Sequence, residues 1–336
     1  MAQQSHTVEW IVISLAVAFF GLVGIVVLVS SMMDVWRALG SPGWPRVPAE
    51  VVRSEVEAEA YRESDGSSGT MYTAHLVFAY EVDGRAYTTS IIRFGESLGS
   101  GDPSEPELQR LRYPEGARVR VAYDPKNPAV AVARPGLRPW GLAPVFAGMA
   151  LLVAGAFVFL AGRFMLSDAP VLPLILKLMV AVFVLIGLGV GAAGAFNLKD
   201  AWASRSWPVA PGRIVVQQGG ESESRWEDSS GRRQGATTWS TSVVYAFEVD
   251  GVTHYANARR FGQIAGAGKE WASEIAARYP EGATVEVRYH PADPDRAVLE
   301  PGLSWDVLWL PGIGLAFFLF GLAAWAWAVP ALTKGW

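Results

Sequence analysis

The sequence predicts a membrane protein of mixed α and β class, in which four transmembrane helices flank two copies of a small β-rich domain. Two observations support this prediction: four long apolar segments divide the chain, and one series of motifs occurs twice at a constant interval. Between the apolar segments, strand-like patterns are separated by turns rich in glycine and proline, which gives the β-rich part of the prediction. Composition agrees, because 51% of the 336 residues are hydrophobic and only 18% are charged.

The duplication is visible in the pentapeptide Arg-Tyr-Pro-Glu-Gly, in a later tyrosine-containing proline turn, and in a closing Pro-Gly pair, all of which occur twice. The two copies are separated by 166 residues throughout, as counted between Arg112 and Arg278, Tyr123 and Tyr289, and Gly136 and Gly302. Constant spacing between separate motifs indicates that one unit has been duplicated. We therefore predict β-rich domains at residues 44–136 and 207–302.

Four segments exceed the roughly 18 consecutive apolar residues that a helix needs to cross the hydrocarbon layer of a membrane. We predict transmembrane helices at residues 8–33, 140–162, 171–196 and 307–329. The residues before the first segment contain no lysine or arginine, so this segment is predicted to be a retained span and not a cleaved signal peptide.

Tryptophans mark the ends of the predicted spans, as expected for amphipathic rings at the depth of lipid headgroups. The set comprises Trp10, Trp36, Trp140, Trp202, Trp207, Trp305, Trp309, Trp325 and Trp327. Trp44 and Trp207 stand before prolines at matching positions of the two repeats. For these two residues, a place at the membrane surface and a place in the domain core are equally compatible with the sequence.

Glycines recur at helical spacing inside the spans. The set comprises Gly141, Gly148, Gly155, Gly162, Gly187, Gly191, Gly314 and Gly321. Because helices in lipid associate through close approach of their backbones, these stripes predict a packed four-helix bundle, or contact with another membrane protein. A general enrichment of glycine in bacterial spans is the alternative explanation.

The alternation of spans and domains places both domains on one face of the membrane, and both termini and the turn at residues 163–170 on the other. Basic residues near the span ends are more frequent on the domain side, where they are Arg37, Arg46, Arg134, Arg138, Lys199, Arg205, Arg213 and Arg296. By the positive-inside rule this count favours cytoplasmic domains. Lys177, the only basic residue within a span, is expected to extend its amine to the membrane surface.

Each domain contains signals for about five strands and one short helix. The predicted strands of the first domain occupy residues 47–60, 71–82, 85–94, 117–123 and 129–133, with a helix at 105–113. The second domain has matching strands at 241–249, 252–261, 283–289 and 296–299, with a helix at 269–279. The dipeptides Asp83-Gly84 and Asp250-Gly251 predict type I′ hairpin turns. Strands of this length and number would curl into a small barrel or a sandwich.

Two polar segments, at residues 61–70 and 217–240, are predicted to be loops. The second contains a single tryptophan, Trp226, which is a candidate anchor for a partner protein. A solvated hairpin tip is the alternative interpretation of this segment.

The motifs together resemble a known family. Their order is a Val-Asp-Gly hairpin, then Arg-Phe-Gly, a short helix, Tyr-Pro-Glu-Gly, and the turn Tyr123-Asp124-Pro125-Lys126-Asn127-Pro128. This order resembles the bacterial membrane-anchored family known as domain of unknown function 3592, in both halves of the chain. The resemblance implies the fold and attachment to the inner membrane of a bacterium, and it implies no activity. The second copy departs from the pattern, since His290 and Asp293 replace the aspartate and the asparagine of the turn.

No residues are predicted to be catalytic, to bind a cofactor or to ligate a metal. Asp124 is expected to build a turn, as aspartate before proline commonly does. The four histidines, His6, His75, His254 and His290, are not at metal-ligand spacing, and the absence of cysteine excludes thiolate chemistry and disulfides.

The sequence therefore favours a multi-pass membrane protein whose paired domains act as a scaffold or protein-interaction module. An enzyme subunit at the membrane surface and an accessory subunit of a transporter are the alternatives. The net charge of −4 and the absence of a basic block argue against nucleic acid as a partner. The expected partner is the lipid bilayer.

Overall fold

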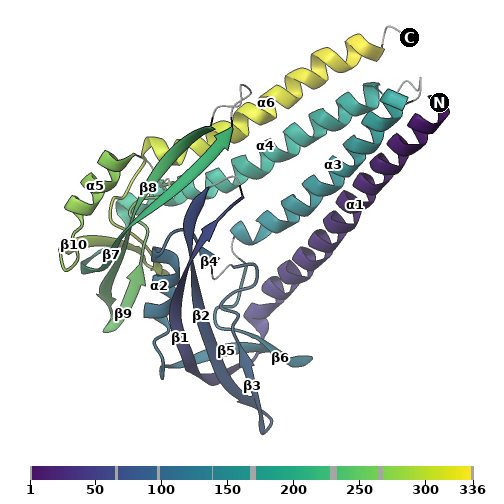
Figure 1. Ribbon diagram of the computed structural model, residues 1–336. Coiled ribbons are helices and arrows are strands. Elements are labelled where there is room, and N and C mark those ends of the chain that lie inside the picture. Colours follow the sequence, from purple (N-terminus) through teal and green to yellow (C-terminus); the bar gives the residue numbers. More distant parts are fainter. Residues whose placement is uncertain are drawn as a thin grey trace.

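A computed structural model gives the structure of residues 2–64, 67–96, 99–137, 139–166, 172–227, 233–263 and 268–333. Two antiparallel sheets lie at one end of four long helices, and both ends of the chain lie at the opposite end of these helices (Figure 1). Both β-rich domains are therefore on the same side of the helical layer.

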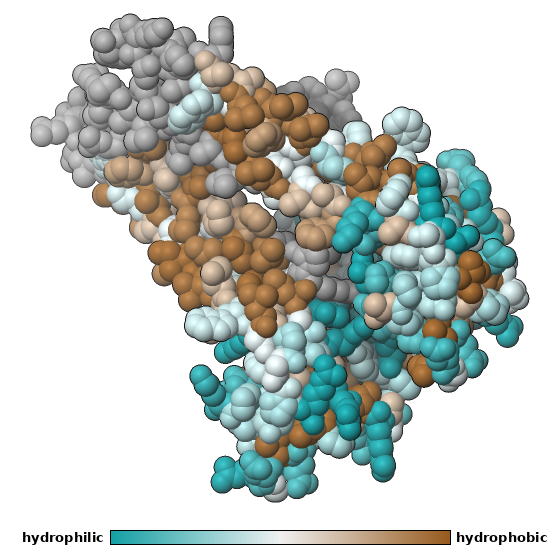
Figure 2. All heavy atoms as spheres, turned by 180° about the vertical axis from the view of Figure 1, so that it is seen from behind, coloured by the Kyte–Doolittle hydropathy of each residue, from teal (hydrophilic) through white to brown (hydrophobic). Residues whose placement is uncertain are grey.

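The long helices correspond to the four apolar segments, and they are α1 (Ala2–Gly40), α3 (Ala143–Leu166), α4 (Leu172–Ala203) and α6 (Trp305–Thr333). Each is long and apolar enough to cross a membrane. Helices α1 and α4 continue past the predicted spans to the linkers of the domains. On the face shown in Figure 2, apolar residues cover the helices and polar residues cover most of the sheets.

The helices associate in pairs, α1 with α3 and α4 with α6, and glycines lie at both contacts. A Cβ atom added to Gly148 of α3 would lie 2.9 Å from the backbone nitrogen of Leu28 in α1. The matching glycine of α6, Gly314, lies directly against the backbone of Gly191 in α4. The expected four-helix bundle is thus two helix pairs, one for each repeat, with α3 and α4 adjacent between them (Figure 1).

The first sheet has the strand order β3-β2-β1-β5-β6, with a short strand β4 also paired to β2. Its strands are β1 (Arg46–Arg62), β2 (Ser68–Val82), β3 (Arg85–Thr89), β4 (Gly99–Ser100), β5 (Arg118–Asp124) and β6 (Asn127–Val132). Helix α2 (Ser104–Arg112) joins β4 to β5, and the 3₁₀ turns η1 (Ser41–Gly43) and η2 (Pro139–Leu142) connect the sheet to α1 and α3.

The second sheet repeats this order as β9-β8-β7-β10-β11. Its strands are β7 (Val209–Glu227), β8 (Arg233–Val249), β9 (Val252–Ala256), β10 (Thr284–His290) and β11 (Asp293–Val298), with helix α5 (Lys269–Arg278) and the turn η3 (Ser204–Ser206). One bridge, between Ser68 of β2 and Glu223 of β7, joins the two sheets. The predicted content of about five strands and one short helix in each repeat is confirmed.

The two hairpin turns have the backbone that their sequences predict. Asp83 and Gly84 have φ angles of 51° and 75°, and Asp250 and Gly251 have 52° and 77°. Two consecutive residues with positive φ define a type I′ turn, whose twist matches that of the flanking strands.

The sheets are open, and neither the barrel nor the sandwich expected from the sequence is present as such. Strand β3 ends at Thr89 and does not form a ladder with β6. The irregular backbone beyond both strands makes two hydrogen bonds instead, from Ala133 N to Ile91 O (3.1 Å) and from Arg134 N to Ile92 O (2.8 Å). Because β3 is only five residues long, the sheet curls without closing.

The prediction of loops at residues 61–70 and 217–240 is wrong over half of the first segment and over most of the second. Strands β1 and β2 pair out to Arg62 and Ser68, and β7 and β8 pair out to Glu227 and Arg233. A ladder of backbone hydrogen bonds does not require apolar side chains, so a polar ribbon can extend beyond the core of a sheet. The centre of the second segment, residues 228–232, lies outside the described part of the chain.

Equivalent side chains fill the cores of the two sheets. Phe78 and Val121 are fully buried in the first core, and Tyr245 and Val287 are fully buried in the second. Trp44 and Trp207, for which the sequence left two positions open, pack beneath the sheets. Each meets the phenylalanine of its Arg-Phe-Gly motif edge to face, with ring centroids 5.8 Å apart for Trp44 and 5.7 Å apart for Trp207.

Candidate functional site

Asp124 builds a turn at the end of β5, and its counterpart in the second repeat does the same with a different side chain. The carboxylate oxygen Oδ1 of Asp124 accepts a hydrogen bond from Lys126 N at 2.9 Å. In the second repeat, the ring nitrogen Nδ1 of His290 accepts a hydrogen bond from Ala292 N at 3.2 Å. This turn requires a side-chain hydrogen-bond acceptor two residues before the backbone amide that donates. Histidine provides one as aspartate does, so the replacement preserves the turn.

The histidines with described side chains have different partners. Nε2 of His75 lies 3.0 Å from a carboxylate oxygen of Glu57 across the β1–β2 ladder, and the ring of His290 packs edge to face on Trp207. Nδ1 of His254 lies 2.9 Å from Asp295 Oδ1. Over the described residues, no group of three or more histidine, cysteine or acidic residues is arranged to hold a metal ion. The side chains of His6, Lys177 and Trp226 lie outside the part of the chain that the structure describes.

A polar junction that the sequence did not predict joins the two repeats. Helix α2 of the first repeat lies between the two sheets (Figure 1). From its last turn, Arg112 donates hydrogen bonds to the carbonyl oxygen of Tyr255 in β9, with Nη2 at 2.6 Å and Nε at 3.2 Å, and Nη2 also reaches Asp295 O at 3.3 Å. Burial lowers the pKa of Arg112, although the nearby Asp295 acts in the opposite direction.

Charged and polar side chains extend the junction on both sides of Arg112. Arg134 Nη2 lies 2.7 Å from Asp295 Oδ2, and Asn257 Nδ2 donates to Glu105 Oε2 at 2.9 Å. Burial by itself would raise the pKa of Asp295. The charge of Arg112, the hydrogen bond with His254 and the charge of Arg134 together hold this pKa below its ordinary value. The junction thus fixes the two repeats through satisfied polar contacts, with Asp295 ionised at neutral pH.

The equivalent arginine of the second repeat has a different environment. Arg278 ends α5 as Arg112 ends α2, but its side chain is 51% exposed and pairs with Glu274 one turn earlier at 2.8 Å. Only the placement of α2 between the sheets distinguishes the two arginines, because the motif around them is the same. The sequence therefore held no signal for the junction beyond the repeated arginine.

A second polar cluster is internal to the second repeat. Arg259, which is 4% exposed, donates to Glu300 Oε2 at 2.8 Å, and the hydroxyl of Tyr279 donates to Glu300 Oε1 at 2.8 Å. Burial and the hydrogen bond with Glu300 raise the pKa of Tyr279 to about 12. Burial would raise the pKa of Glu300 too, but hydrogen bonds from Arg259 and Tyr279 keep it below its ordinary value. These groups satisfy one another, so the cluster is structural.

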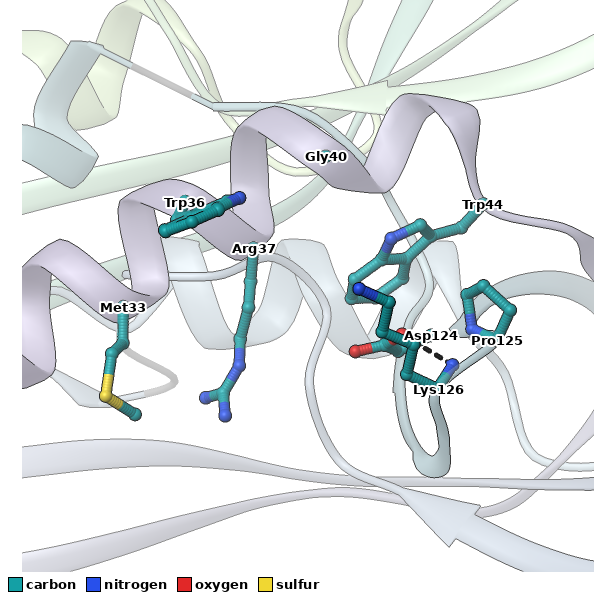
Figure 3. Close-up of a pocket in the computed structure, with 8 residues that line it drawn as sticks. All are labelled: Met33, Trp36, Arg37, Gly40, Trp44, Asp124, Pro125 and Lys126. Carbon is teal, nitrogen blue, oxygen red and sulfur yellow. Dashed lines mark hydrogen bonds between the residues drawn. The ribbon is translucent and has the colours of Figure 1, made fainter.

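A cavity of about 330 Å³ lies where α1 meets the first sheet (Figure 3). It is lined by Met33, Trp36, Arg37, Gly40, Trp44, Asp124, Pro125 and Lys126. The wall is therefore mostly apolar, and it carries two cationic side chains and one carboxylate. Figure 3 shows Met33 and Arg37 projecting from the helix, with Trp44, Asp124 and Lys126 on the other side of the cavity.

The cations of this cavity are only loosely engaged by the rest of the chain. Arg37 Nη1 lies 3.8 Å from Asp34 Oδ1, at the outer limit of an ion pair, and its side chain is 40% exposed. Among the described residues, Lys126 has no ion-pair partner for its amine, and the lysine is exposed. Both groups are thus free to bind an anion.

The second repeat has no cation at the two positions equivalent to Arg37 and Lys126. The two repeats are aligned at this point by the serines after the helices, since Gly136 N donates to Ser41 Oγ and Gly302 N donates to Ser204 Oγ. In this alignment Asp200 stands in place of Arg37 and is paired with Arg296, and Ala292 stands in place of Lys126. The cationic cavity is therefore a property of the first repeat.

Two open antiparallel sheets, each framed by a pair of membrane-length helices, define a duplicated domain of mixed class with a polar junction between its copies. The family described as Domain of unknown function (DUF3592) matches residues 47–138 and 210–304, which together make up more than half of the chain. The chain belongs to this family and carries two tandem copies of its domain, as the motifs indicated. No curated protein gives a significant match to the chain.

Proposed function

We propose that this chain is a four-span membrane protein whose paired sheets form one rigid unit that docks a partner protein. Large apolar side chains exposed along the helices support the membrane placement, among them Leu15, Phe19 and Leu22 of α1 and Phe320 of α6. Exposed tryptophans at the sheet end of the helices support it further: Trp36 is 80% exposed and Trp305 is 86% exposed, as suits rings at headgroup depth.

The observation that carries the docking role is a free strand edge on the distal ribbon, which we define as residues 220–227 of β7 and 233–240 of β8. Strand β9 pairs with β8 only from Tyr245 to Val249, so among the described strands none covers β8 from Arg233 to Ser240. Residues 235–238 are exposed. An uncovered strand edge can accept a strand from another protein through backbone hydrogen bonds, and specificity then comes from alternate side chains.

The junction supports this role because it holds the ribbon in a fixed orientation. Arg112, Arg134 and Asn257 connect the first repeat to the second through hydrogen bonds and ion pairs. A rigid mounting reduces the entropy that is lost when a partner binds.

The test is to shorten the distal ribbon and compare the proteins that co-purify in mild detergent. Residues 221–239 are replaced by Asn-Gly, which joins the paired residues Gly220 and Ser240 in a two-residue hairpin. The matched control replaces residues 61–69 by Asn-Gly between Ala60 and Thr70, which shortens the equivalent ribbon of the first repeat. We expect the partner to be lost only from the first variant, with both variants folded; equal recovery from both would contradict the proposal.

An accessory role in a transporter complex would need a helix surface other than the glycine stripes. Gly148 and Gly155 of α3 pack against α1, and Gly187 of α4 and Gly314 of α6 lie at the contact between those two helices. These glycines are therefore occupied within the chain.

We also propose that the sheets face the cytoplasm, on the basis of the basic residues near the sheet ends of the helices, and that the membrane is the inner membrane of a bacterium, as the family resemblance implies. Because the chain contains no cysteine, single substitutions report orientation cleanly. An impermeant maleimide added to intact cells should label Ser5→Cys near the N-terminus and leave Ser67→Cys in the β1–β2 turn unlabelled. The opposite pattern would reverse the orientation, and labelling of both sites would remove the four-span arrangement.

A further inference from the structure

We infer that the cavity between α1 and the first sheet binds the headgroup of an anionic phospholipid, with Arg37 and Lys126 holding the phosphate. This inference rests on the membrane placement proposed above. It depends on three features of the cavity: its depth relative to the apolar part of α1, the chemistry of its wall, and its charge.

The depth of the cavity matches the headgroup layer. Met33 is the last residue of the predicted first span, and Gly40 is the last residue of α1. The helix rises about 10 Å between these two residues, at roughly 1.5 Å per residue. The headgroup layer on one side of a membrane is about 5–8 Å thick, so the cavity opens at the level of the phosphates.

The wall combines the two surfaces that a lipid presents. Met33, Trp36 and Trp44 supply an apolar wall, and Trp36 is 80% exposed beside the cavity. Tryptophan rings at this depth pack against the glycerol and the first methylene groups of a lipid. The cationic side chains lie farther from the hydrocarbon, since Arg37 is one turn past Met33 and Lys126 comes from the β5–β6 turn.

The charge of the cavity favours an anion. Among the lining residues, Arg37 and Lys126 contribute two positive charges and Asp124 contributes one negative charge, which leaves one net positive charge; Asp34, outside the lining, lies 3.8 Å from Arg37. A headgroup with a single negative charge, such as that of phosphatidylglycerol, complements this set. Arg37 can donate two parallel hydrogen bonds to a phosphate and Lys126 can donate from a point charge, whereas the carboxylate of Asp124 is engaged by the amide of Lys126.

The second repeat provides the variant that tests the site. The double substitution Arg37→Asp with Lys126→Ala installs the residues that stand at these positions in the second repeat. The matched control is Lys199→Ala, which removes an exposed cation near the sheet end of α4, away from the cavity. The full chain is purified in a neutral detergent and titrated with short-chain phosphatidylglycerol, and the bound lipid is measured by native mass spectrometry.

We expect the double variant to bind phosphatidylglycerol at least about tenfold more weakly than the native chain, since two charge-assisted contacts are lost, and we expect Lys199→Ala to bind within about twofold. Phosphatidylcholine should bind the native chain more weakly than phosphatidylglycerol does. Equal binding by the native chain and the double variant would overturn the inference.

The source of the phosphate is tested by competition with inorganic phosphate. Inability of inorganic phosphate to displace the lipid supports a lipid site, because the apolar wall then contributes to binding. Displacement at equal concentration would show a simple anion site and overturn the lipid assignment. The maleimide experiment tests the membrane placement separately, so failure of the proposed topology is distinguishable from failure of this site.

Discussion

The two repeats share one fold and differ in what their surfaces contact. Both have the same strand order, the same type I′ turn and a tryptophan packed on the phenylalanine of Arg-Phe-Gly. Arg112, however, donates a hydrogen bond to the other sheet, whereas its equivalent Arg278 lies at the surface. The cavity cations Arg37 and Lys126 likewise have no counterpart in the second repeat. The shared motifs therefore give both repeats the same fold, while residues outside the two cores make different contacts in each repeat.

The largest effect is expected where the repeats are most alike, at the glycines between paired helices. Gly314→Val should destabilise the α4–α6 pair by about 3 kcal/mol, because the new side chain meets the backbone of Gly191 and cannot be accommodated by a rotamer change. Gly148→Val should cost somewhat less, since a Cβ atom there would lie 2.9 Å from the backbone nitrogen of Leu28, whereas a Cβ atom at Gly314 would lie closer still to the backbone nitrogen of Gly191. Thermal unfolding in detergent measures both variants.

Gly21→Val is the control for this pair, because a Cβ atom at Gly21 meets nothing within 4 Å. An equal loss of stability in all three variants would show that glycine contributes through the helix backbone and not through packing.

The second-largest change in stability is expected at the two equivalent arginines, Arg112 and Arg278, and it should differ between the repeats. Arg112→Ala should lower the free energy of unfolding by about 2 kcal/mol, because it leaves the carbonyl of Tyr255 without its donor and removes a charge beside Asp295. Arg278→Ala should cost less than about 1 kcal/mol, because its side chain is half exposed and its contacts with Glu274 at 2.8 Å and with Glu300 at 3.7 Å are screened by solvent. Urea unfolding followed by tryptophan fluorescence compares the two; similar losses would mean that the junction adds nothing.

Acid should weaken the junction specifically. The pKa of Asp295 is lower in the folded chain than in the unfolded chain, so folding favours the ionised form and its contribution is present at neutral pH. This contribution is lost as the pH falls below about 4, through the folded pKa of Asp295. Asp295→Asn should cost about 1 kcal/mol at pH 7 and should flatten the acid limb of the stability profile. An unchanged acid limb would assign the pH dependence to other carboxylates.

The smallest effect is expected at the turns that differ between repeats. Asp124→His introduces the residue of the second repeat and should change stability by less than about 0.5 kcal/mol, since histidine also offers an acceptor to the following turn. Asp124→Ala removes the acceptor and should cost about 1 kcal/mol. The same unfolding assay applies, and a neutral Asp124→Ala would show that proline alone forms the turn.

Most of the fold was predictable from residues with strong local preferences. The type I′ turns followed from Asp83-Gly84 and Asp250-Gly251, and the four helices followed from long apolar runs. The long ribbons were missed because residues 61–70 and 217–240 lack the alternation that burial imposes on a strand. Their backbones pair nevertheless, because hydrogen bonding between neighbouring strands is independent of side-chain polarity.

The candidate site was only partly predictable. Asp124 was expected to form a turn, and it does, but the cavity that it lines depends on how closely the β5–β6 turn approaches α1. Arg37 and Lys126 are 89 positions apart and belong to no common motif. Nothing in their spacing could indicate that they face the same cavity.

The sequence by itself determined the duplication, the helices and the strand content, because these depend on periodicity and on turn residues that act over a few positions. Only the tertiary structure decided that the sheets stay open, that glycines pair the helices within each repeat, and that Arg112 is half-buried while Arg278 is exposed. The physical reason is that identical local motifs acquire different environments when one copy packs against the other, and contacts between distant segments leave no periodic trace in the chain.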